Sequence, residues 1–488
     1  MKKISPMLCA VFFLPVVCLL SAQLAHAETL SLQEAMRLAV ENNPNMQTAG
    51  YEVDARLDEQ HSVRGRFLPV VRASANILYW DDAASSDMDL SAITGILGDM
   101  APLLPASSQE KLAKLKSNSP SIQVHDQLTY KASVTVSQPL IQLYGIYFSH
   151  EAAGEMAQAA SYDQKSARLQ LELEIARTYY GLLAATGMKD SLKQALGQIE
   201  VYETQVKAFL DTGRVELNAL MKVDVQRADL QRALFAADKA IQLAKARLNM
   251  LMGRPQETKF EAESIRLNIS EDSPDFPDAT YLSFMDHAIA NRPDILSIRQ
   301  TTNASRSRRQ AAISAMLPEL NAVFNYDYNG GMGAMQPENQ YFVGLTLNWN
   351  IWEWGASYYQ VRASEARMSQ AASRLDAQTE QTRLEVRSRK LDLDEAIHGY
   401  GVALAQREQA MENLRVETAR YHAEQTTTAD LLQAQTLDVR SANDLVQAEV
   451  KVLESRQSLL VASGYDLLDA ELRSSQREPA RHVFNPNR

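Results

Sequence analysis

The feature that most constrains this chain is a stretch that occurs twice, at residues 42–69 and 291–318. Each copy has an Asn-x-Pro triplet followed 25 residues later by the proline of a Leu-Pro pair. The copies are offset by 249 residues, and their flanks agree at Ala39 and Ala288, Asn76 and Asn325, and Tyr79 and Tyr328. An internal duplication requires both halves to share one architecture.

The first half, residues 28–255, is predicted to contain two strands and three helices. Apolar and polar side chains alternate in the strand segments, which is typical of a sheet with one apolar face. The predicted strands lie near 70–80 and 128–139, and the predicted helices at 30–66, 146–210 and 218–252. Pro44 should break the first helix because proline cannot continue helical hydrogen bonding. At about 1.5 Å per residue, the long proline-free helix would measure roughly 100 Å.

The second half, residues 282–466, repeats this plan. Its strands are predicted near 319–328 and 341–352, and its helices at 282–316, 356–423 and 429–463. The acidic, Pro-containing segment 256–281 is predicted to be an exposed connector, and 467–488 a polar, disordered tail. The Gly-rich sequence 330–333 joins two strands, so it indicates a hairpin turn rather than a phosphate loop. The insertion 81–126 is either an extracellular lid or a surface loop.

The N-terminus predicts export from the cytoplasm. Two lysines, an apolar run and Ala25-His26-Ala27 form the pattern of a signal peptide over residues 1–27. Both cysteines, Cys9 and Cys18, fall within it, so disulfides and thiol catalysis are not expected in the mature chain. The segment also holds two of the 49 basic residues and none of the 60 acidic ones. The remaining net charge of −13 argues against nucleic acid as a partner.

The four strands have the length and pattern of membrane-spanning β-strands, which need about nine to eleven residues. Aromatic residues gather at their ends, where Tyr and Trp favour the bilayer interface: Tyr79, Trp80, Tyr328, Tyr341, Trp349, Trp352 and Trp354. Lipid is expected to contact Val134, Val136, Leu345 and Leu347, and the lumen Ser133, Thr135 and Thr346. A half-buried sheet of a soluble protein would show similar alternation. Four strands cannot close a barrel, because the smallest have about eight, so several chains would have to contribute.

The duplication, the long helices and the four strands together resemble the TolC family of outer-membrane efflux proteins. The resemblance covers nearly all of residues 28–466, and its most specific marks are Leu68-Pro69, Leu317-Pro318 and the segment 421–433. It implies a mixed α/β membrane protein, a homotrimer whose twelve-stranded β-barrel continues into a periplasmic α-helical barrel, with segment 256–281 in its equatorial region. It also implies an outer-membrane conduit for efflux or type I secretion that works with a periplasmic adaptor and an inner-membrane transporter.

The resemblance further implies a periplasmic gate at the helix tips. Where the family carries a tyrosine, an arginine and two aspartates, this chain has Tyr421, Thr426, Asp430 and Gln433, and the first half offers Asn218 as the partner. Since two of the four positions depart from the pattern, neutral hydrogen bonds are expected to close the tips. Asp430 also fits a capping box with Thr427, which is the alternative reading of that residue.

No pattern in the sequence favours catalysis. The eight histidines show no metal-ligand spacing and no Gly-x-Ser-x-Gly motif is present, so an enzyme, a metal site and a cofactor are not expected. A periplasmic coiled-coil adaptor or a structural protein remains the alternative function, because both also contain long helices. The cargo is left open: drugs, metabolites, metal ions and proteins all remain candidates.

Overall fold

The computed structural model describes residues 28–87, 91–117, 121–263, 281–333 and 336–468. The expected signal peptide and most of both the connector and the tail therefore lie outside the described residues. The chain divides into two compact units. Unit 1 comprises Met1–Ala39, Glu174–Glu271 and Gly399–Glu454, and unit 2 comprises Val40–Leu173, Asp272–His398 and Ser455–Arg488.

The duplication is confirmed, with the bounds of paired elements equal or within two residues. Helices α1 (Leu32–Asn42) and α2 (Pro44–Gly65) recur at the 249-residue offset as α7 (Tyr281–Asn291) and α8 (Pro293–Ser314). From the second strand of each half onward the offset is 211: β5 (Leu128–Pro139), α5 (Leu143–Asp211) and α6 (Leu217–Leu251) match β8 (Asn339–Asn348), α9 (Ala356–His422) and α10 (Thr428–Ala462). The difference of 38 residues lies in the longer first β-hairpin.

Proline determines where the N-terminal helices of both halves break. Pro44 and Pro293 each occupy the first turn of a new helix, where a missing N–H costs nothing. The Asn43 side chain accepts a hydrogen bond from the Asn45 amide at 2.8 Å and caps α2. The break predicted at Pro44 is confirmed, whereas the single helix predicted over 282–316 is wrong: α7 ends at Asn291 and α8 begins at Pro293.

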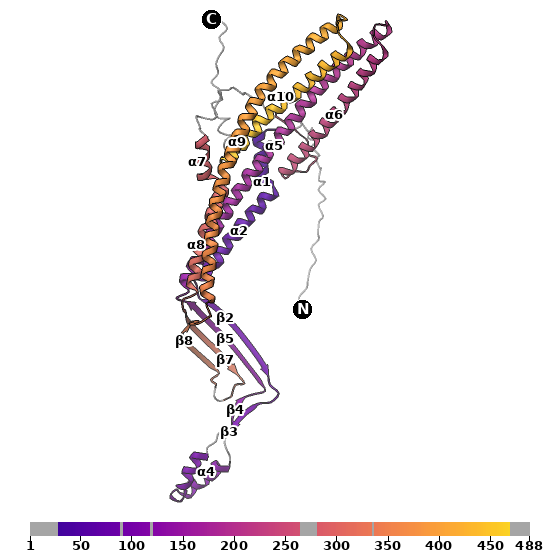
Figure 1. The fold of residues 1–488 in the computed structure, drawn as a ribbon. Helices are drawn as coiled ribbons and strands as arrows, with labels where there is room; N and C mark the ends of the chain where they lie inside the picture. Colours follow the sequence, from indigo (N-terminus) through magenta and orange to yellow (C-terminus); the bar gives the residue numbers. More distant parts are fainter. Residues whose placement is uncertain (1–27, 88–90, 118–120, 264–280, 334–335, 469–488) are drawn as a thin grey trace, which may run out of the picture. The chain divides into compact units, whose positions relative to one another are not determined.

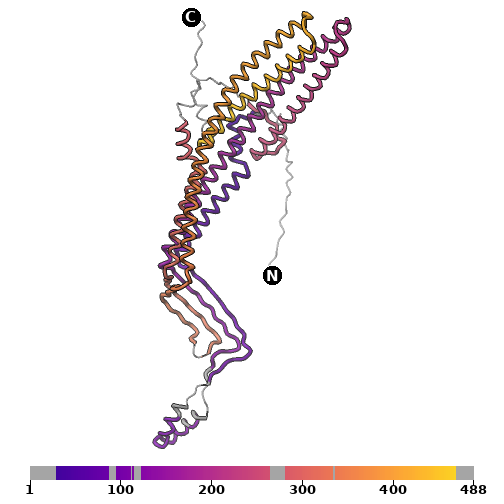
Figure 2. Tube along the Cα trace, viewed as in Figure 1, coloured from indigo at the N-terminus to yellow at the C-terminus, as the bar shows by residue number. Residues whose placement is uncertain are grey.

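Unit 1 contains the turn ends of two helical hairpins, one formed by α5 and α6 and the other by α9 and α10. Figures 1 and 2 show both turns at the same end of this unit. A shared apolar core holds the hairpins together, and its fully buried members are Ile199, Val206, Val223 and Leu431. This packing stabilises the long helices, which have little amphipathic pattern over their whole length.

A small parallel sheet corrects the prediction of an exposed connector. β6 (Phe260–Ala262) pairs with β1 (Glu28–Leu30), and only 1% of Phe260 is exposed. The buried Tyr179 hydroxyl lies 2.8 Å from the Leu30 carbonyl and 3.0 Å from that of Glu263, so it bridges the two strands. Burial raises the pKa of Tyr179 to about 12, which keeps the hydroxyl protonated as a donor.

Unit 2 contains the antiparallel four-stranded sheet, with β2 (Val70–Tyr79) and β7 (Glu319–Gly330) added to β5 and β8 (Figure 1). The strand order is β2-β5-β7-β8, so each β-hairpin lies beside the other. The sequence predicted that this strand ends near residue 352, but β8 ends at Asn348. Beyond it the chain turns sharply through Trp354 and Gly355, whose φ angles are 54° and 85°.

The Gly-rich turn after β7 docks against the first hairpin, which confirms its assignment as a hairpin turn. The Asp126 amide donates to the Gly331 carbonyl at 2.7 Å. A Cβ on Gly331 would lie 2.1 Å from the Leu128 carbonyl oxygen, and one on Gly333 would lie 1.9 Å from that of Gln123. Only glycine fits at these two positions.

The insertion between β2 and β5 is structured where it is described. Its elements are β3 (Ala84–Asp87), α3 (Ser91–Asp99), η1 (Ala101–Leu103), α4 (Ala106–Ser117) and β4 (Ser121–His125). β3 and β4 pair with each other and form the base of the insertion. Trp80 helps to hold this base, because its indole stacks on His125 at 4.7 Å and donates to Thr129 at 3.0 Å.

Candidate functional site

The register of the four-stranded sheet separates an apolar face from a polar face. Residues paired across neighbouring strands share a face, and Val134 pairs with Ala73 on one side and Tyr326 on the other. The predicted grouping is confirmed: the apolar face includes Val134, Val136, Leu345 and Leu347, and the polar face Ser133, Thr135 and Thr346. The apolar side chains are open to the surroundings, with Leu345 67% exposed.

Polar contacts between strands cover the opposite face. Lys131 forms a 3.2 Å ion pair with Asp327, and Thr135 donates to the Asn325 side chain at 2.7 Å. This face therefore carries charged and hydrogen-bonding side chains and suits contact with water. The edges differ from the centre, since β2 and β8 each have one partner strand among the described residues. Each edge leaves a row of backbone groups available to another strand.

The interface aromatics divide between the two ends of the sheet. Those at the β-hairpin end are Tyr79, Trp80, Tyr328 and Tyr341, and those at the helix end are Trp349, Trp352 and Trp354. Tyr79, Tyr341, Trp352 and Trp354 are each more than 70% exposed. The last three tryptophans follow β8 rather than belonging to it. Strands of about ten residues separate the two groups by roughly 30 Å.

The two helical-hairpin turns have matching backbones but different residues. Gly213 and Glu424, which are related by the 211-residue offset, both have left-handed φ angles, 73° and 60°. In each turn the left-handed residue and the next one donate backbone hydrogen bonds to the end of the preceding helix. Glutamate is unusual at such a position, because its Cβ is strained there.

Glu424 links the two turns. Its carboxylate accepts a hydrogen bond from Arg214 at 2.6 Å, with both side chains more than half exposed. The Arg214 guanidinium also lies 5.9 Å from the centre of the Phe209 ring. The contacts expected at the tips were neutral, so this charged link within one chain was not anticipated.

Tyr421, at the end of α9, lies inside the chain's own core. It is 4% exposed, its ring is 5.9 Å from that of Phe209, and its hydroxyl lies 3.2 Å from the Thr428 hydroxyl. In a single chain this tyrosine therefore holds the second turn closed and packs the two hairpins together.

Asp430 forms the capping box that the sequence allows. Its carboxylate accepts hydrogen bonds from the Thr427 amide at 3.1 Å and hydroxyl at 2.6 Å, and the Asp430 amide donates to that hydroxyl at 3.3 Å. Thr426 adds a hydroxyl donor at 3.2 Å. The Thr427 side chain, then its amide and Thr426, lower the pKa of Asp430 below its ordinary value. Asp430 therefore stays ionised at neutral pH while remaining exposed.

The other two gate candidates are exposed: Gln433 in the second turn of α10 and Asn218 in the first turn of α6. The structure thus brings Thr426 and Asp430 together and puts Tyr421 in the nearby core. Arg214, Glu424 and Phe209 were missed. The sequence signal that could have found Glu424 is the 211-residue offset, which aligns it with Gly213.

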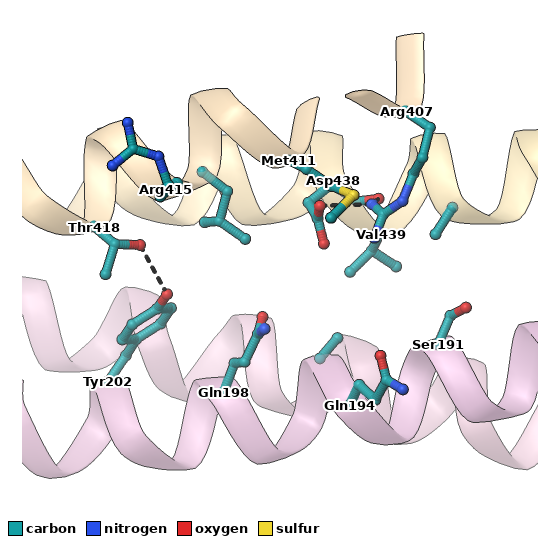
Figure 3. A pocket seen from close by; sticks show the side chains of 13 residues that line it. Ser191, Gln194, Gln198, Tyr202, Arg407, Met411, Arg415, Thr418, Asp438 and Val439 are labelled. Atoms are coloured by element: carbon teal, nitrogen blue, oxygen red, sulfur yellow. Dashed lines mark hydrogen bonds and ion pairs between the residues drawn. The ribbon is translucent and has the colours of Figure 1, made fainter. Parts of the chain in front are cut away.

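A hollow of about 490 Å³ lies farther along unit 1, between α5 and the second hairpin (Figure 3). Tyr202 and Thr418 join across it through hydroxyls 3.2 Å apart. Arg407, half-buried, forms a 2.5 Å ion pair with Asp438. Met411 is 52% exposed in the lining, which combines apolar with polar and charged side chains.

Helix α6 carries a second apolar stripe opposite its buried face. The buried face includes Val223, Leu230, Ala237 and Leu248. At about 100° per residue, a different set of side chains falls on the far side, each at least half exposed: Leu217, Met221, Val225, Phe235, Leu243 and Met250. This stripe extends over most of the helix and marks an interaction surface.

Among the described residues, every helix is too short or too polar to span a lipid bilayer. The same residues contain no group of three or more His, Asp or Glu side chains able to hold a metal ion.

Comparison with known proteins shows which family and which proteins this chain is similar to. Residues 284–465 match the outer membrane efflux protein family. Outer membrane efflux protein BepC of Brucella suis is 26% identical over 278 residues, covering 54% of this chain and 55% of BepC. Fusaric acid resistance protein FusA of Burkholderia cepacia is 24% identical over 208 residues, covering 41% of this chain and 36% of FusA. The match therefore spans about half of BepC and about a third of FusA.

The fold agrees over a longer span. The CmeC outer membrane channel of Campylobacter jejuni superposes with a TM-score of 0.71 at 15% identity, covering 91% of this chain and 89% of that one. Residues 284–465 are therefore similar to the outer membrane efflux protein family, and the chain has the fold of a solved outer membrane channel.

Proposed function

We propose that this chain is the outer-membrane channel subunit of a tripartite efflux or type I secretion system. In this proposal it is a passive conduit from the periplasm to the cell exterior. The observation that carries the proposal is the amphipathic sheet with two open edges: Leu345 and its neighbours suit lipid, and the Lys131–Asp327 side suits water. BepC is named an efflux protein and CmeC a channel, which supports the same role.

The proposed assembly is a homotrimer with a shared twelve-stranded barrel. A sheet in lipid cannot keep open edges, since each unsatisfied backbone group there costs several kcal/mol. Pairing β8 of one copy with β2 of the next removes both edges. Three copies supply twelve strands, more than the roughly eight of the smallest barrels. The apolar stripe of α6 would be covered by a neighbouring copy in the same assembly.

The proposed location is the outer membrane, with the helical hairpins in the periplasm. The two groups of aromatic residues would then mark the two bilayer surfaces. The proposed partners are a periplasmic adaptor and an inner-membrane transporter. The hollow that contains Met411 and Arg407 offers an adaptor helix both apolar and charged side chains.

The proposed gate lies at the hairpin tips. In each chain the Arg214–Glu424 pair ties the first turn to the second, and Tyr421 packs against Phe209 beneath it. Opening would require the second hairpin to move away from the first, which breaks these contacts. Asp430, kept ionised by its capping box, would present one carboxylate per chain close to the tips.

The test is fractionation of cells producing the full-length chain, followed by native mass measurement of the detergent extract. The proposal requires the protein in the outer-membrane fraction and a mass of three chains. A soluble periplasmic protein would contradict the channel and favour the adaptor alternative. A membrane-inserted monomer would contradict the shared barrel.

A further inference from the structure

A cavity of about 400 Å³ lies where the helices meet the sheet in unit 2. Its walls come from the end of α8, the first residue of β7, the end of β8 and the beginning of α9. The turn 349–355, which also contributes to the lining, is shaped by consecutive left-handed residues, Trp354 and Gly355. These two residues reverse the chain within one turn and bring the tryptophans beside α9.

The lining combines aromatic rings with negative charge. Trp349, Trp352 and Tyr358 supply the rings, and Glu319 and Glu353 supply the carboxylates. No lysine, arginine or histidine is among the lining residues of this described cavity. A cation is therefore the complementary ligand, since aromatic faces and carboxylates both attract an ammonium group.

Neutral donors fix one of these carboxylates in place. Glu353 accepts a hydrogen bond from the Ser357 hydroxyl at 2.5 Å and another from the Asn350 side chain. Neither donor carries a charge, so neither competes with a cation for Glu353. Glu319 is exposed at the beginning of β7. The cavity thus has one oriented carboxylate and one accessible carboxylate.

The surroundings are apolar and open. Ile351, also in the lining, is 79% exposed, and Leu317 is 44% exposed. Trp352 packs edge to face with Trp354 at 5.8 Å. Under the proposed function, on which this inference rests, these tryptophans lie at the periplasmic surface of the outer membrane. That is the depth of the headgroups of the inner leaflet.

We infer that this cavity binds the ammonium headgroup of a membrane phospholipid, with the acyl chains lying along the apolar residues outside it. The ammonium would sit between the rings and the two carboxylates. Headgroup selectivity follows from charge: an ethanolamine lipid is favoured over a glycerol lipid, whose headgroup has no cation to offer.

The test is native mass spectrometry of the purified full-length protein, delipidated and then equilibrated with equal amounts of phosphatidylethanolamine and phosphatidylglycerol. The wild type should retain the ethanolamine lipid preferentially. The double substitution Glu319→Gln and Glu353→Gln should lower that retention about tenfold, which corresponds to roughly 1.4 kcal/mol. Glu338→Gln, at the other end of the sheet, is the matched control and should change nothing.

Equal retention of both lipids by the wild type would overturn the inference, as would selectivity that survives the double substitution. A trimer that retains neither lipid would show that a neighbouring copy fills the cavity instead. The same spectra report the oligomer, so failure of the trimer is seen separately from failure of lipid binding. Trp352→Phe gives a second readout, since it keeps the ring and should preserve most of the selectivity.

Discussion

Replacing Glu424 with glycine should ease opening of the tips without destabilising the fold. The structure shows why these two effects separate. Glu424 has a φ of 60°, whereas the equivalent turn of the first half uses Gly213 at 73°. A residue with a Cβ in this conformation costs about 1–2 kcal/mol. The stabilising contact that opposes this cost is the ion pair between Glu424 and Arg214.

The cost of the strained backbone at Glu424 exceeds the stabilisation that its ion pair provides. Arg214 and Glu424 are 55% and 57% exposed, and pairs this exposed contribute about 0.2–1 kcal/mol. Glu424→Gly removes the strain and the pair, and glycine restores about 0.4–1 kcal/mol of unfolded-state freedom. Its net effect on the free energy of unfolding should lie within about 1 kcal/mol of zero. Glu424→Gln keeps the strain and loses the pair, so it should destabilise by about 0.2–1 kcal/mol.

The assay combines thermal unfolding with conductance in planar bilayers. Both variants should conduct more than the wild type, because both lose the link between the two turns. Their melting temperatures should differ, with the glycine variant the more stable. The charge swap Arg214→Glu with Glu424→Arg restores an ion pair at the same backbone position, and it should return conductance toward the wild-type level.

Wild-type conductance in both single variants would show that the Arg214–Glu424 pair does not restrain opening of the tips. So would a charge swap that conducts as freely as Glu424→Gln, because the link would then not depend on opposite charge. If Glu424→Gly melts well below Glu424→Gln, the backbone at residue 424 is not strained, and the left-handed turn tolerates glutamate at little cost.

Three further predictions test other parts of the molecule. Leu345→Arg should abolish trimer assembly, since arginine in mid-bilayer costs about 2–4 kcal/mol; Thr346→Arg should assemble, and equal outcomes would argue against a membrane sheet. Tyr179→Phe should lower the free energy of unfolding by about 1–3 kcal/mol, measured by denaturant titration against the exposed control Tyr51→Phe, and equal values would contradict the bridge. Asp430→Asn should lower the melting temperature at neutral pH. Because the pKa of Asp430 is lowered in the folded chain, this difference should vanish as the pH falls below 3.8 and through the lowered pKa; a difference that persists would contradict the charged cap.

Much of the fold could be predicted because its signals are local. The prolines break helices by sterics and missing hydrogen bonds, and alternation identifies strands one residue at a time. The end of β8 was predicted too late because alternation continues through Trp349 and Ile351 although the backbone has already turned. Side-chain pattern does not report a change of φ at Trp354.

The parts that could not be predicted depend on distant contacts. β6 has three residues and acquires its structure from β1 and Tyr179, far away in sequence. The Arg214–Glu424 pair joins residues 210 apart, and neither loop alone predicts it. The gate positions were instead carried over from a family pattern. Of those positions, only Thr426 and Asp430 contact each other directly.

The differences between the halves lie at one end of the sheet and at the hairpin tips. The helical framework repeats to within two residues, so it provides two equivalent hairpins per chain. At one end of the sheet only the first half has the insertion, and the glycines of the second half are shaped to dock against its base. At the tips only the second half replaces glycine with a charged, strained residue. In the proposed trimer the two kinds of hairpin would alternate around the axis, so Glu424 would recur at every second position. The Arg214–Glu424 pair would then link unlike hairpins rather than identical ones.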